Sequence, residues 1–274
     1  MALAAAWLAC APFAFASGDV RLWHSLDSAM ASQLARLAAE YNAAQSEFNV
    51  RLAPLPAGAK GLVRLGLPLN TARPVLYYNR DAFRRAKLNS AALPKTWYDM
   101  AGVMGALADS GQACAYTTSW PAWVMLENTG GAFSRQLMVR WTSMLATWEK
   151  SGFFSYSGRA NEAEARFAAG ECAILTSSSA SQSELAKRAR FEVGVAPLPY
   201  YDDSGIAARG VPPTGAAVWA ERQSVGVTNF FAFLATRAAE ARRIRDLMEA
   251  ELEAVWRGDK TALDALDAVS AKQK

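Results

Sequence analysis

Two indoles stand close together in a short segment that could contact a ligand. Residues 119–123 read Ser-Trp-Pro-Ala-Trp, so Trp120 and Trp123 lie where a proline breaks regular structure just after an apolar, strand-like run. Loops at strand ends are where α/β folds bind ligands. The alternative is that both rings pack in a core or between lobes, and the pattern leaves both roles open.

A run of hydroxyls forms a second group that could contact a ligand. Residues 176–179 read Thr-Ser-Ser-Ser and present side-chain hydroxyls, followed by backbone N–H groups where a helix is expected to begin. The start of a helix can hold an anion, although a hydroxyl that only caps the helix is the commoner use. The segment therefore predicts either an anion contact or an N-cap.

Enzyme chemistry has little support in this sequence. His24 is the only histidine, which excludes a multi-histidine metal site and makes any Ser-His-Asp or Cys-His arrangement depend on this residue. Packing or hydrogen bonding at the lip of a cleft is its simpler role, and a hydrolase that uses His24 is the enzymatic alternative. Nucleophile-elbow, zinc-protease, P-loop and dinucleotide-binding motifs are absent. Glu249, Glu251 and Glu253 are spaced as a solvated helix face. We expect no catalysis, cofactor or metal.

Composition describes a folded protein with a mildly basic balance. The 274 residues are 52% hydrophobic and 20% charged, enough to bury one or two sizeable cores. The net charge is +4, but lysines and arginines are scattered among acids, so nucleic-acid binding is not expected. A basic balance suits an anionic ligand.

Strands and helices that alternate along the chain must position these groups. The pattern predicts an α/β layered architecture, with a helix that starts at the capping box of Thr96. Strands are expected near residues 20–23, 49–55, 75–78, 114–118, 173–175, 193–196 and 216–219, and helices near 30–41, 81–88, 96–111, 137–148, 161–169, 228–256 and 260–271.

The N-terminus has the features of an export signal. Residues 1–16 carry no charge, and Ala14-Phe15-Ala16 before Ser17 has the small-x-small form that signal peptidase accepts. A positively charged start is missing, so a buried N-terminal segment or a signal that lost its first residues is the alternative. The run is too short to span a membrane, and the surroundings of Cys10 fit a lipoprotein signal poorly. We expect a periplasmic protein without a lipid anchor.

Two cysteines remain after the expected leader. Cys114 and Cys172 each lie in a short apolar, strand-like run. An oxidising compartment permits a disulfide between them but does not require one, so a bridge and two buried thiols both stay open.

Several stretches, in the same order along the chain, resemble the glycerol-3-phosphate receptors of the extracellular solute-binding protein family 1, which serve ATP-binding-cassette importers. They are residues 23–25, 74–79, 94–97, 120–128, 154–156, 170–173, 194–200 and 251–256.

The resemblance implies a two-lobed α/β fold of the Venus-flytrap type, with the ligand in the cleft between lobes that close on binding. It implies that residues 17–110 are mainly lobe 1, residues 111–220 are mainly lobe 2, and the helices of residues 221–274 return toward the hinge and lobe 1. It also implies a monomer that delivers a small phosphorylated polyol to membrane permease subunits.

Five positions match ligand-binding residues of the family. Trp120 and Trp123 match tryptophans that pack against the glycerol moiety, Ser178 matches a hydroxyl ligand, Gly215 a backbone donor, and Arg245 the arginine that holds the phosphate. A guanidinium gives bidentate, charge-assisted hydrogen bonds to phosphate oxygens, while indole faces cover the C–H side of a polyol.

Other parts of the family pattern are missing, because members of the family are considerably longer. The tyrosine and glutamate ligands expected between Leu52 and Asn70 have no counterpart, and Ala72 occupies the position of a ligand serine, with Thr71 beside it as a substitute. The predicted function is capture of glycerol-3-phosphate or a glycerophosphodiester. The alternatives are an oligosaccharide-binding relative and a minimal scaffold that no longer binds.

Overall fold

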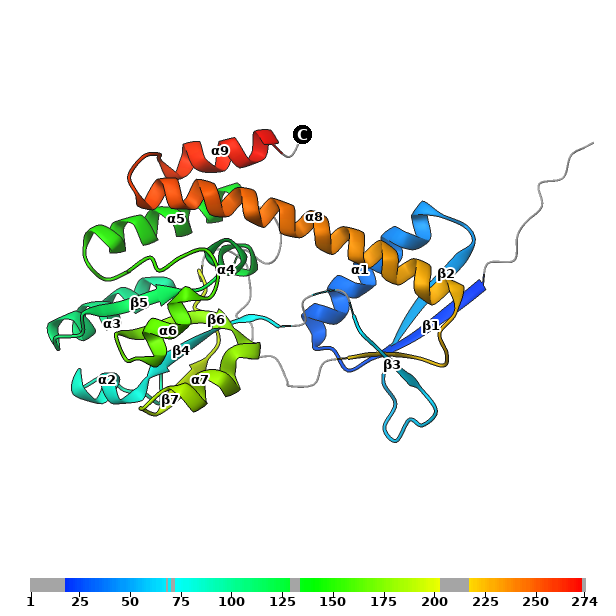
Figure 1. The fold of residues 1–274 in the computed structure, drawn as a ribbon, viewed down its shortest axis with the longest axis horizontal. Helices are drawn as coiled ribbons and strands as arrows, with labels where there is room; N and C mark the ends of the chain where they lie inside the picture. Colours follow the sequence, from blue (N-terminus) through cyan, green and yellow to red (C-terminus); the bar gives the residue numbers. More distant parts are fainter. Residues whose placement is uncertain (1–17, 68, 70–71, 129–133, 203–216, 273–274) are drawn as a thin grey trace, which may run out of the picture. The chain divides into compact units, whose positions relative to one another are not determined.

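The computed structural model describes residues 18–67, 69, 72–128, 134–202 and 217–272. The expected leader, Thr71 and Gly215 lie outside these residues. The chain divides into two compact units, each with its own four-stranded sheet (Figure 1). Strands alternate with helices along both units, which confirms the predicted α/β class.

Unit 1 contains the described residues within Met1–Leu69 and Thr214–Arg237. Val20 and Leu22 alternate with the exposed Asp19 and Arg21 in an inner strand of its sheet. They are buried in one cluster with Leu34 of the helix Ser28–Ala44 and Phe230 of the helix Val225–Trp256. The Asn42 side chain donates to the carbonyl of Val50 and accepts from its N–H, at 3.0 and 2.8 Å, and so ties that helix to the sheet.

The sheet of unit 1 has the order β2-β1-β8-β3, with β1 and β2 parallel and β8 antiparallel to both of its neighbours. Its elements are β1 (Gly18–His24), α1 (Ser28–Ala44), β2 (Phe48–Pro54), β3 (Val63–Leu65), β8 (Val218–Ala220) and the first part of α8 (Val225–Trp256).

Unit 2 contains the described residues within Asn70–Pro213 and Ala238–Lys274. All residues of three of its four strands, β4, β5 and β6, are buried, because helices cover both faces of the sheet. The sheet order is β5-β6-β4-β7, with β5 and β6 parallel and β4 antiparallel to β6 and β7. The strands are β4 (Pro74–Asn79), β5 (Cys114–Thr118), β6 (Cys172–Ser178) and β7 (Val193–Ala196).

The core of unit 2 is rich in aromatic side chains. Trp97, Tyr116, Trp141 and Trp148 are buried in one cluster, where Trp97 contacts both Tyr116 and Trp148. The remaining elements are α2 (Arg80–Arg85), α3 (Trp97–Asp109), α4 (Pro121–Asn128), α5 (Arg135–Lys150), α6 (Glu162–Ala168), the 3-10 turn η1 (Ser179–Ser181), α7 (Gln182–Arg188), α9 (Ala262–Lys272) and the rest of α8. The Thr96 hydroxyl accepts from the Asp99 N–H at 3.1 Å, which confirms the predicted start of α3.

The division between the units differs from the boundaries expected from the sequence. Residues 70–110 were expected mainly in lobe 1, but they belong to unit 2, because β4 is hydrogen-bonded between β6 and β7 and α3 packs on β5. Helix α8 is shared, since its residues up to Arg237 belong to unit 1 and those from Ala238 to unit 2.

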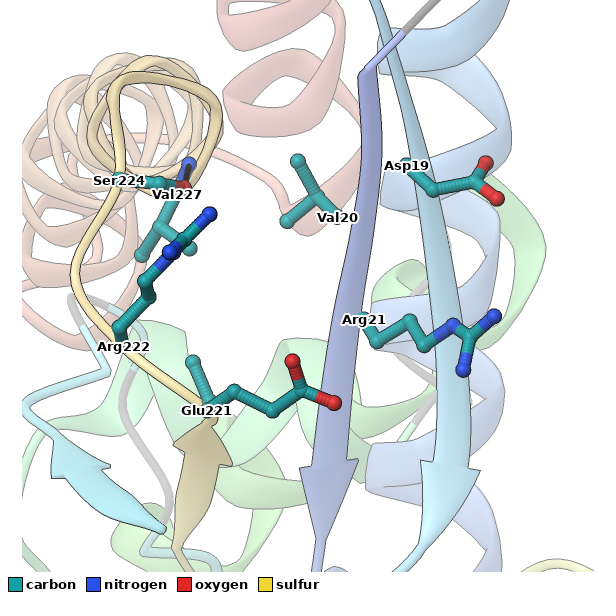
Figure 2. A pocket seen from close by; sticks show the side chains of 8 residues that line it. Asp19, Val20, Arg21, Glu221, Arg222, Ser224 and Val227 are labelled. Atoms are coloured by element: carbon teal, nitrogen blue, oxygen red, sulfur yellow. Dashed lines mark hydrogen bonds between the residues drawn. The ribbon is translucent and has the colours of Figure 1, made fainter.

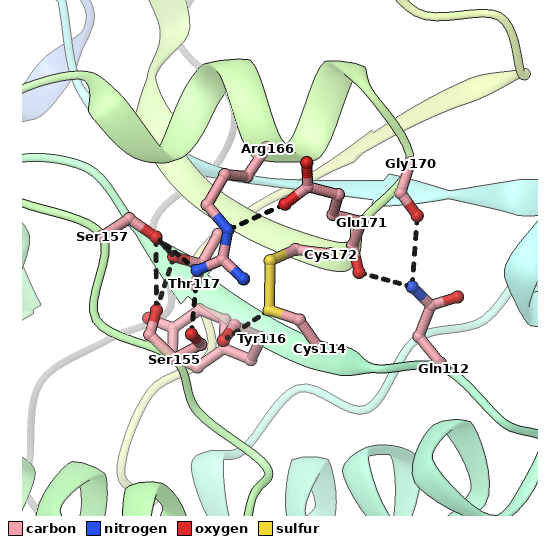
Figure 3. Close-up of polar contacts among 10 residues, drawn as sticks. All are labelled: Gln112, Cys114, Tyr116, Thr117, Ser155, Ser157, Arg166, Gly170, Glu171 and Cys172. Carbon is pink, nitrogen blue, oxygen red and sulfur yellow. Dashed lines mark hydrogen bonds and ion pairs between the residues drawn. A yellow bond between two sulfur atoms is a disulfide. The ribbon is translucent and has the colours of Figure 1, made fainter.

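A disulfide joins Cys114 and Cys172, so the two cysteines are not free thiols (Figure 3). They are paired in register at the first residues of the parallel strands β5 and β6. Beside the bridge, Gln112 donates to the carbonyls of Gly170 and Glu171 at 3.2 and 2.7 Å. These links hold the N-terminal ends of β5 and β6 together.

In the part of the chain that the structure describes, no helix combines the length and apolar character needed to cross a membrane.

Candidate functional site

The two indoles lie at the C-terminal end of β5, in unit 2. Trp120 has a φ of 44°, a left-handed conformation that is rare for a bulky residue and marks a strained turn. Its N–H donates to the carbonyl of Ala160 at 2.9 Å. The Trp120 and Trp123 rings meet edge to face with centroids 6.3 Å apart.

The two rings differ in burial. Trp123 is 8% exposed and belongs to the core of unit 2, whereas Trp120 is only partly buried and packs against that core. The structure therefore supports core packing for Trp123, and it leaves part of Trp120 open to solvent.

Glu249 of α8 holds the first turn of α4. The N–H of Ala122 donates to Glu249 Oε1 at 2.9 Å, across 127 positions of sequence. The N-terminal N–H groups of a helix have no partner within the helix, and the capping position here is Trp120, which has no side-chain oxygen. The Glu249 carboxyl takes that role.

The expectation of a solvated face for the three glutamates of α8 is wrong for two of them. Glu249 is 7% and Glu251 is 6% exposed. Burial raises the pKa of Glu251, but hydrogen bonds from Lys260 and Lys272 outweigh burial and hold that pKa below its usual range. The burial of Glu249 was not predicted, because helical spacing does not reveal which other helix will pack over a given carboxyl group.

Arg245 lies one turn before Glu249 on α8 and is half-buried. Burial and the nearby Arg242 lower the pKa of Arg245, while Asp246, Glu127 and Glu249 act in the opposite direction. Among the described residues, the Arg245 side chain makes no hydrogen bond or ion pair. Its guanidinium is therefore a cation near α4 whose donors are not used by the described part of the chain.

Ser178 is used as a helix cap. Its hydroxyl accepts from the Ala180 N–H at 3.2 Å at the start of η1, and its carbonyl accepts from the Tyr77 hydroxyl at 2.7 Å. The N-cap alternative is thus the one seen. An accepted bond leaves the Ser178 hydroxyl proton as a donor.

The neighbours of Ser178 are committed to internal hydrogen bonds. The buried Glu164 carboxyl accepts from the Ser177 and Ser181 hydroxyls, both at 2.6 Å. Ser179 N–H donates to the carbonyl of Arg73 at 2.8 Å, and the Arg73 N–H donates to Ser179 Oγ at 3.1 Å. These contacts fix the end of β6.

The structure links four of the five predicted residues within unit 2. The Ser119 N–H donates to the carbonyl of Thr176 at 2.9 Å, which ties the tryptophan turn to the strand that ends in Ser178. The bond between Ala122 and Glu249 ties the same turn to the helix that carries Arg245. Ala72, at the position of the missing serine, lies in the segment before β4.

His24 belongs to unit 1, whereas Trp120, Trp123, Ser178 and Arg245 belong to unit 2. Its Nδ1 accepts from the Leu26 N–H at 3.4 Å, and burial lowers the pKa of His24. The ring is thus neutral at neutral pH and takes part in the local turn after β1.

Unit 1 also contains a pocket of about 190 Å³ beside β1 and the start of α8 (Figure 2). None of the predicted binding residues lines it. Its lining is Asp19, Val20, Arg21, Ala220, Glu221, Arg222, Ser224 and Val227.

The chain is similar to proteins of known function over most of its length. The family described as bacterial extracellular solute-binding protein matches residues 14–241. The sn-glycerol-3-phosphate-binding periplasmic protein UgpB of Escherichia coli strain K12 is 34% identical over 196 residues, which are 62% of this chain and 45% of the relative. UgpB of Yersinia enterocolitica is 33% identical over 221 residues, 72% of this chain and 50% of the relative. The chain spans about half the length of these relatives.

Two solved structures share the fold. The GacH receptor of Streptomyces glaucescens matches with a TM-score of 0.54 and 14% identity, over 94% of this chain and 98% of that chain. UgpB of Mycobacterium tuberculosis, solved with glycerophosphocholine, matches with a TM-score of 0.53 and 15% identity over the same shares. At these identities the likeness concerns the two-lobed α/β fold alone. Because the family match covers residues 14–241, the chain belongs to the bacterial extracellular solute-binding protein family.

Proposed function

We propose that the chain is the substrate-binding protein of an ATP-binding-cassette importer and captures sn-glycerol-3-phosphate or a glycerophosphodiester. The observation that carries the proposal is Arg245, a half-buried cation on α8 whose donors the described residues leave unused, on the helix that also holds the tryptophan turn through Glu249. A guanidinium matches phosphate oxygens with paired N–H donors, and desolvation strengthens such bonds.

The indoles supply the second part of the recognition. The partly open Trp120 ring, backed by Trp123, offers an apolar face to the carbon chain of a polyol. Ser178 adds a hydroxyl at the end of β6, and Gly215 is proposed as a backbone donor. Curated relatives at 33–34% identity carry sn-glycerol-3-phosphate binding in their names, which supports the same ligand class here.

The proposed function includes a cellular location and a membrane partner. A chain of this family with a cleavable leader would work as a monomer in the periplasm and deliver its ligand to membrane permease subunits. The relatives are named periplasmic proteins, which supports this location.

Oligosaccharide binding is the second candidate. Its support is that an aromatic pair can stack on sugar rings as well as on glycerol, and that the GacH receptor was solved with acarbose. A phosphate-free sugar leaves Arg245 without an anion, which is why the phosphorylated ligand is preferred.

Calorimetric titration with glycerol-3-phosphate, glycerophosphocholine and maltose tests the proposal. We expect heat of binding with the two phosphorylated compounds and none with maltose. Binding of maltose alone would support the oligosaccharide candidate. No binding to a chain whose circular dichroism and cooperative unfolding show that it is folded would support the minimal scaffold.

A further inference from the structure

The Glu249 carboxyl is an acidic group buried beside the candidate site with only one of its oxygens used. Oε1 accepts from the Ala122 N–H at 2.9 Å, whereas Oε2 is buried and has no hydrogen-bond partner among the described residues. A buried carboxylate oxygen without a donor is costly, and a protonated oxygen is much less so. The geometry therefore favours a carboxyl group that keeps its proton.

The charges that face Glu249 come from two segments. Burial raises the pKa of Glu249 to about 8, against the lowering effects of the Ala122 hydrogen bond and of Arg159, and Asp246 and Glu253 raise it further. Tyr156 also faces this carboxyl. At neutral pH the group is mostly uncharged.

Arg159 is already engaged by another acid. Its guanidinium forms an ion pair with Glu253, which also accepts from the Tyr156 hydroxyl at 3.2 Å. Arg245 differs, because none of its donors is used by a described residue. Residues four apart lie on the same face of a helix, and an ionised Glu249 supports the charge of Arg245. If Glu249 ionises, Arg245 is thus a cation that can pair with it and that no acid in the described part of the chain already engages.

We propose that the proton on Glu249 keeps Arg245 available for an anionic ligand, so that capture of a phosphodiester at this site takes up a proton. The inference rests on the proposed function. An ionised Glu249 would compete with the ligand for the guanidinium and would repel its negative charge. Conversely, a bound anion disfavours the ionised form of Glu249, and linkage requires the two effects to be equal.

The sign of the pH effect follows from this competition. An anionic ligand raises the pKa of Glu249 above its ligand-free value of about 8. Proton uptake is therefore greatest slightly above pH 8, and affinity falls as pH rises from 7 to 9.

The first test uses glycerophosphocholine, whose phosphodiester does not titrate in this range. Calorimetry at pH 8 in two phosphate-free buffers of different ionisation enthalpy reports the protons exchanged on binding. We expect fractional uptake by the wild-type chain. Glu249→Gln keeps an acceptor oxygen for Ala122 but has no proton to exchange, so its heat should not depend on the buffer and its affinity should stay level from pH 7 to 9.

A matched control is Glu149→Gln on α5, because burial also raises the pKa of Glu149 and leaves its Oε2 without a described partner. This variant should keep the wild-type uptake. Proton uptake that persists in Glu249→Gln, or wild-type affinity that does not vary with pH, would overturn the proposal.

A ligand-free measurement separates this inference from the proposed function. The carboxyl carbon of Glu249, followed by NMR in the unliganded chain, should titrate near pH 8. In Arg245→Gln the midpoint should rise, because a cation that stabilises the carboxylate is gone. An unchanged midpoint would overturn the coupling even if ligand binds. A raised midpoint with no binding of any phosphorylated ligand would overturn the proposed function alone.

Discussion

Arg245 is proposed to bind the phosphate of a ligand and the tryptophans its carbon chain, so substitutions at these positions should change ligand affinity in different ways. Arg245→Ala should weaken binding of glycerol-3-phosphate by more than about tenfold, since loss of a charge-assisted partner in a partly desolvated site costs about 2–5 kcal/mol. Arg245→Lys should recover only part of this loss, because an ammonium keeps the charge without the planar fork. Calorimetric affinities check both variants. Unchanged affinity in Arg245→Ala would remove this residue from the site.

Trp120→Ala and Trp123→Ala should weaken the binding of phosphorylated and unphosphorylated polyols alike, because the indole rings contribute apolar contact. Their effects on stability should differ. Trp123 is 8% exposed in the core, so its loss should cost about 3–5 kcal/mol of unfolding free energy, while the partly open Trp120 should cost less. Urea unfolding of each variant measures this difference. Equal destabilisation by the two would contradict the assigned burial.

Glu249 should also make folding depend on pH. Its pKa rises from 4.5 to about 8 on folding, so the stability gained from the neutral carboxyl is complete below pH 4.5 and is lost as pH rises through 8. The slope is at most about 1.4 kcal/mol per pH unit. Glu249→Gln should therefore gain stability relative to wild type between pH 5 and 8, measured by urea unfolding at both values. A difference that is constant with pH would contradict the assigned burial of the proton.

At the scale of elements, the disulfide between β5 and β6 can be tested by counting free thiols. No free thiol should be detected from Cys114 and Cys172 in denatured, unreduced protein that is produced from Ser17 onward, so that Cys10 is absent. Replacement of both cysteines by alanine should lower the unfolding free energy by up to about 4 kcal/mol, from the loop of 58 positions that the bridge closes. Two reactive thiols in the unreduced chain would contradict the bridge.

The sequence predicted helices and strands correctly where interactions within a single segment determine its structure. The strand at residues 114–118 and the Thr96 cap agree with the structure, because apolar runs and local capping bonds lie within a few residues. The three-residue strand β3 (Val63–Leu65) was missed, since it is defined by its pairing with β8 and not by its own pattern. The burial of Glu249 was missed for the same reason, because it depends on contact with α4.

At the scale of the whole molecule, the fold class followed from the alternation of elements, but the limits of the two units did not. Composition changes little near Leu69, where the chain leaves unit 1. Strand pairing determines where unit 1 ends and unit 2 begins, because β4 pairs with β6 and β7, which lie far along the sequence. Local patterns singled out Trp120, Trp123 and the hydroxyl run that contains Ser178, but Gly215 and Arg245 came only from resemblance to a family, since residues more than a hundred positions apart show no common pattern.

We predict that export removes a leader and that the mature protein begins near Ser17. Residues 1–16 carry no charge and end in the small-x-small pattern that signal peptidase accepts. N-terminal sequencing of material recovered from the periplasm checks this. Recovery of a soluble cytosolic product that still starts at Met1 would contradict both the leader and the proposed location.

The positive φ of Trp120 has a consequence for how this position can change. A non-glycine residue in this region of backbone space carries about 1–3 kcal/mol of strain, which glycine would release. Glycine would also remove the ring that is proposed to cover the ligand. Because the ring also packs against the core of unit 2, the released strain offsets only part of the lost packing, and Trp120→Gly should destabilise the chain less than Trp120→Ala does. Selection for thermal stability should therefore prefer glycine to alanine at position 120, while selection for ligand capture keeps the indole.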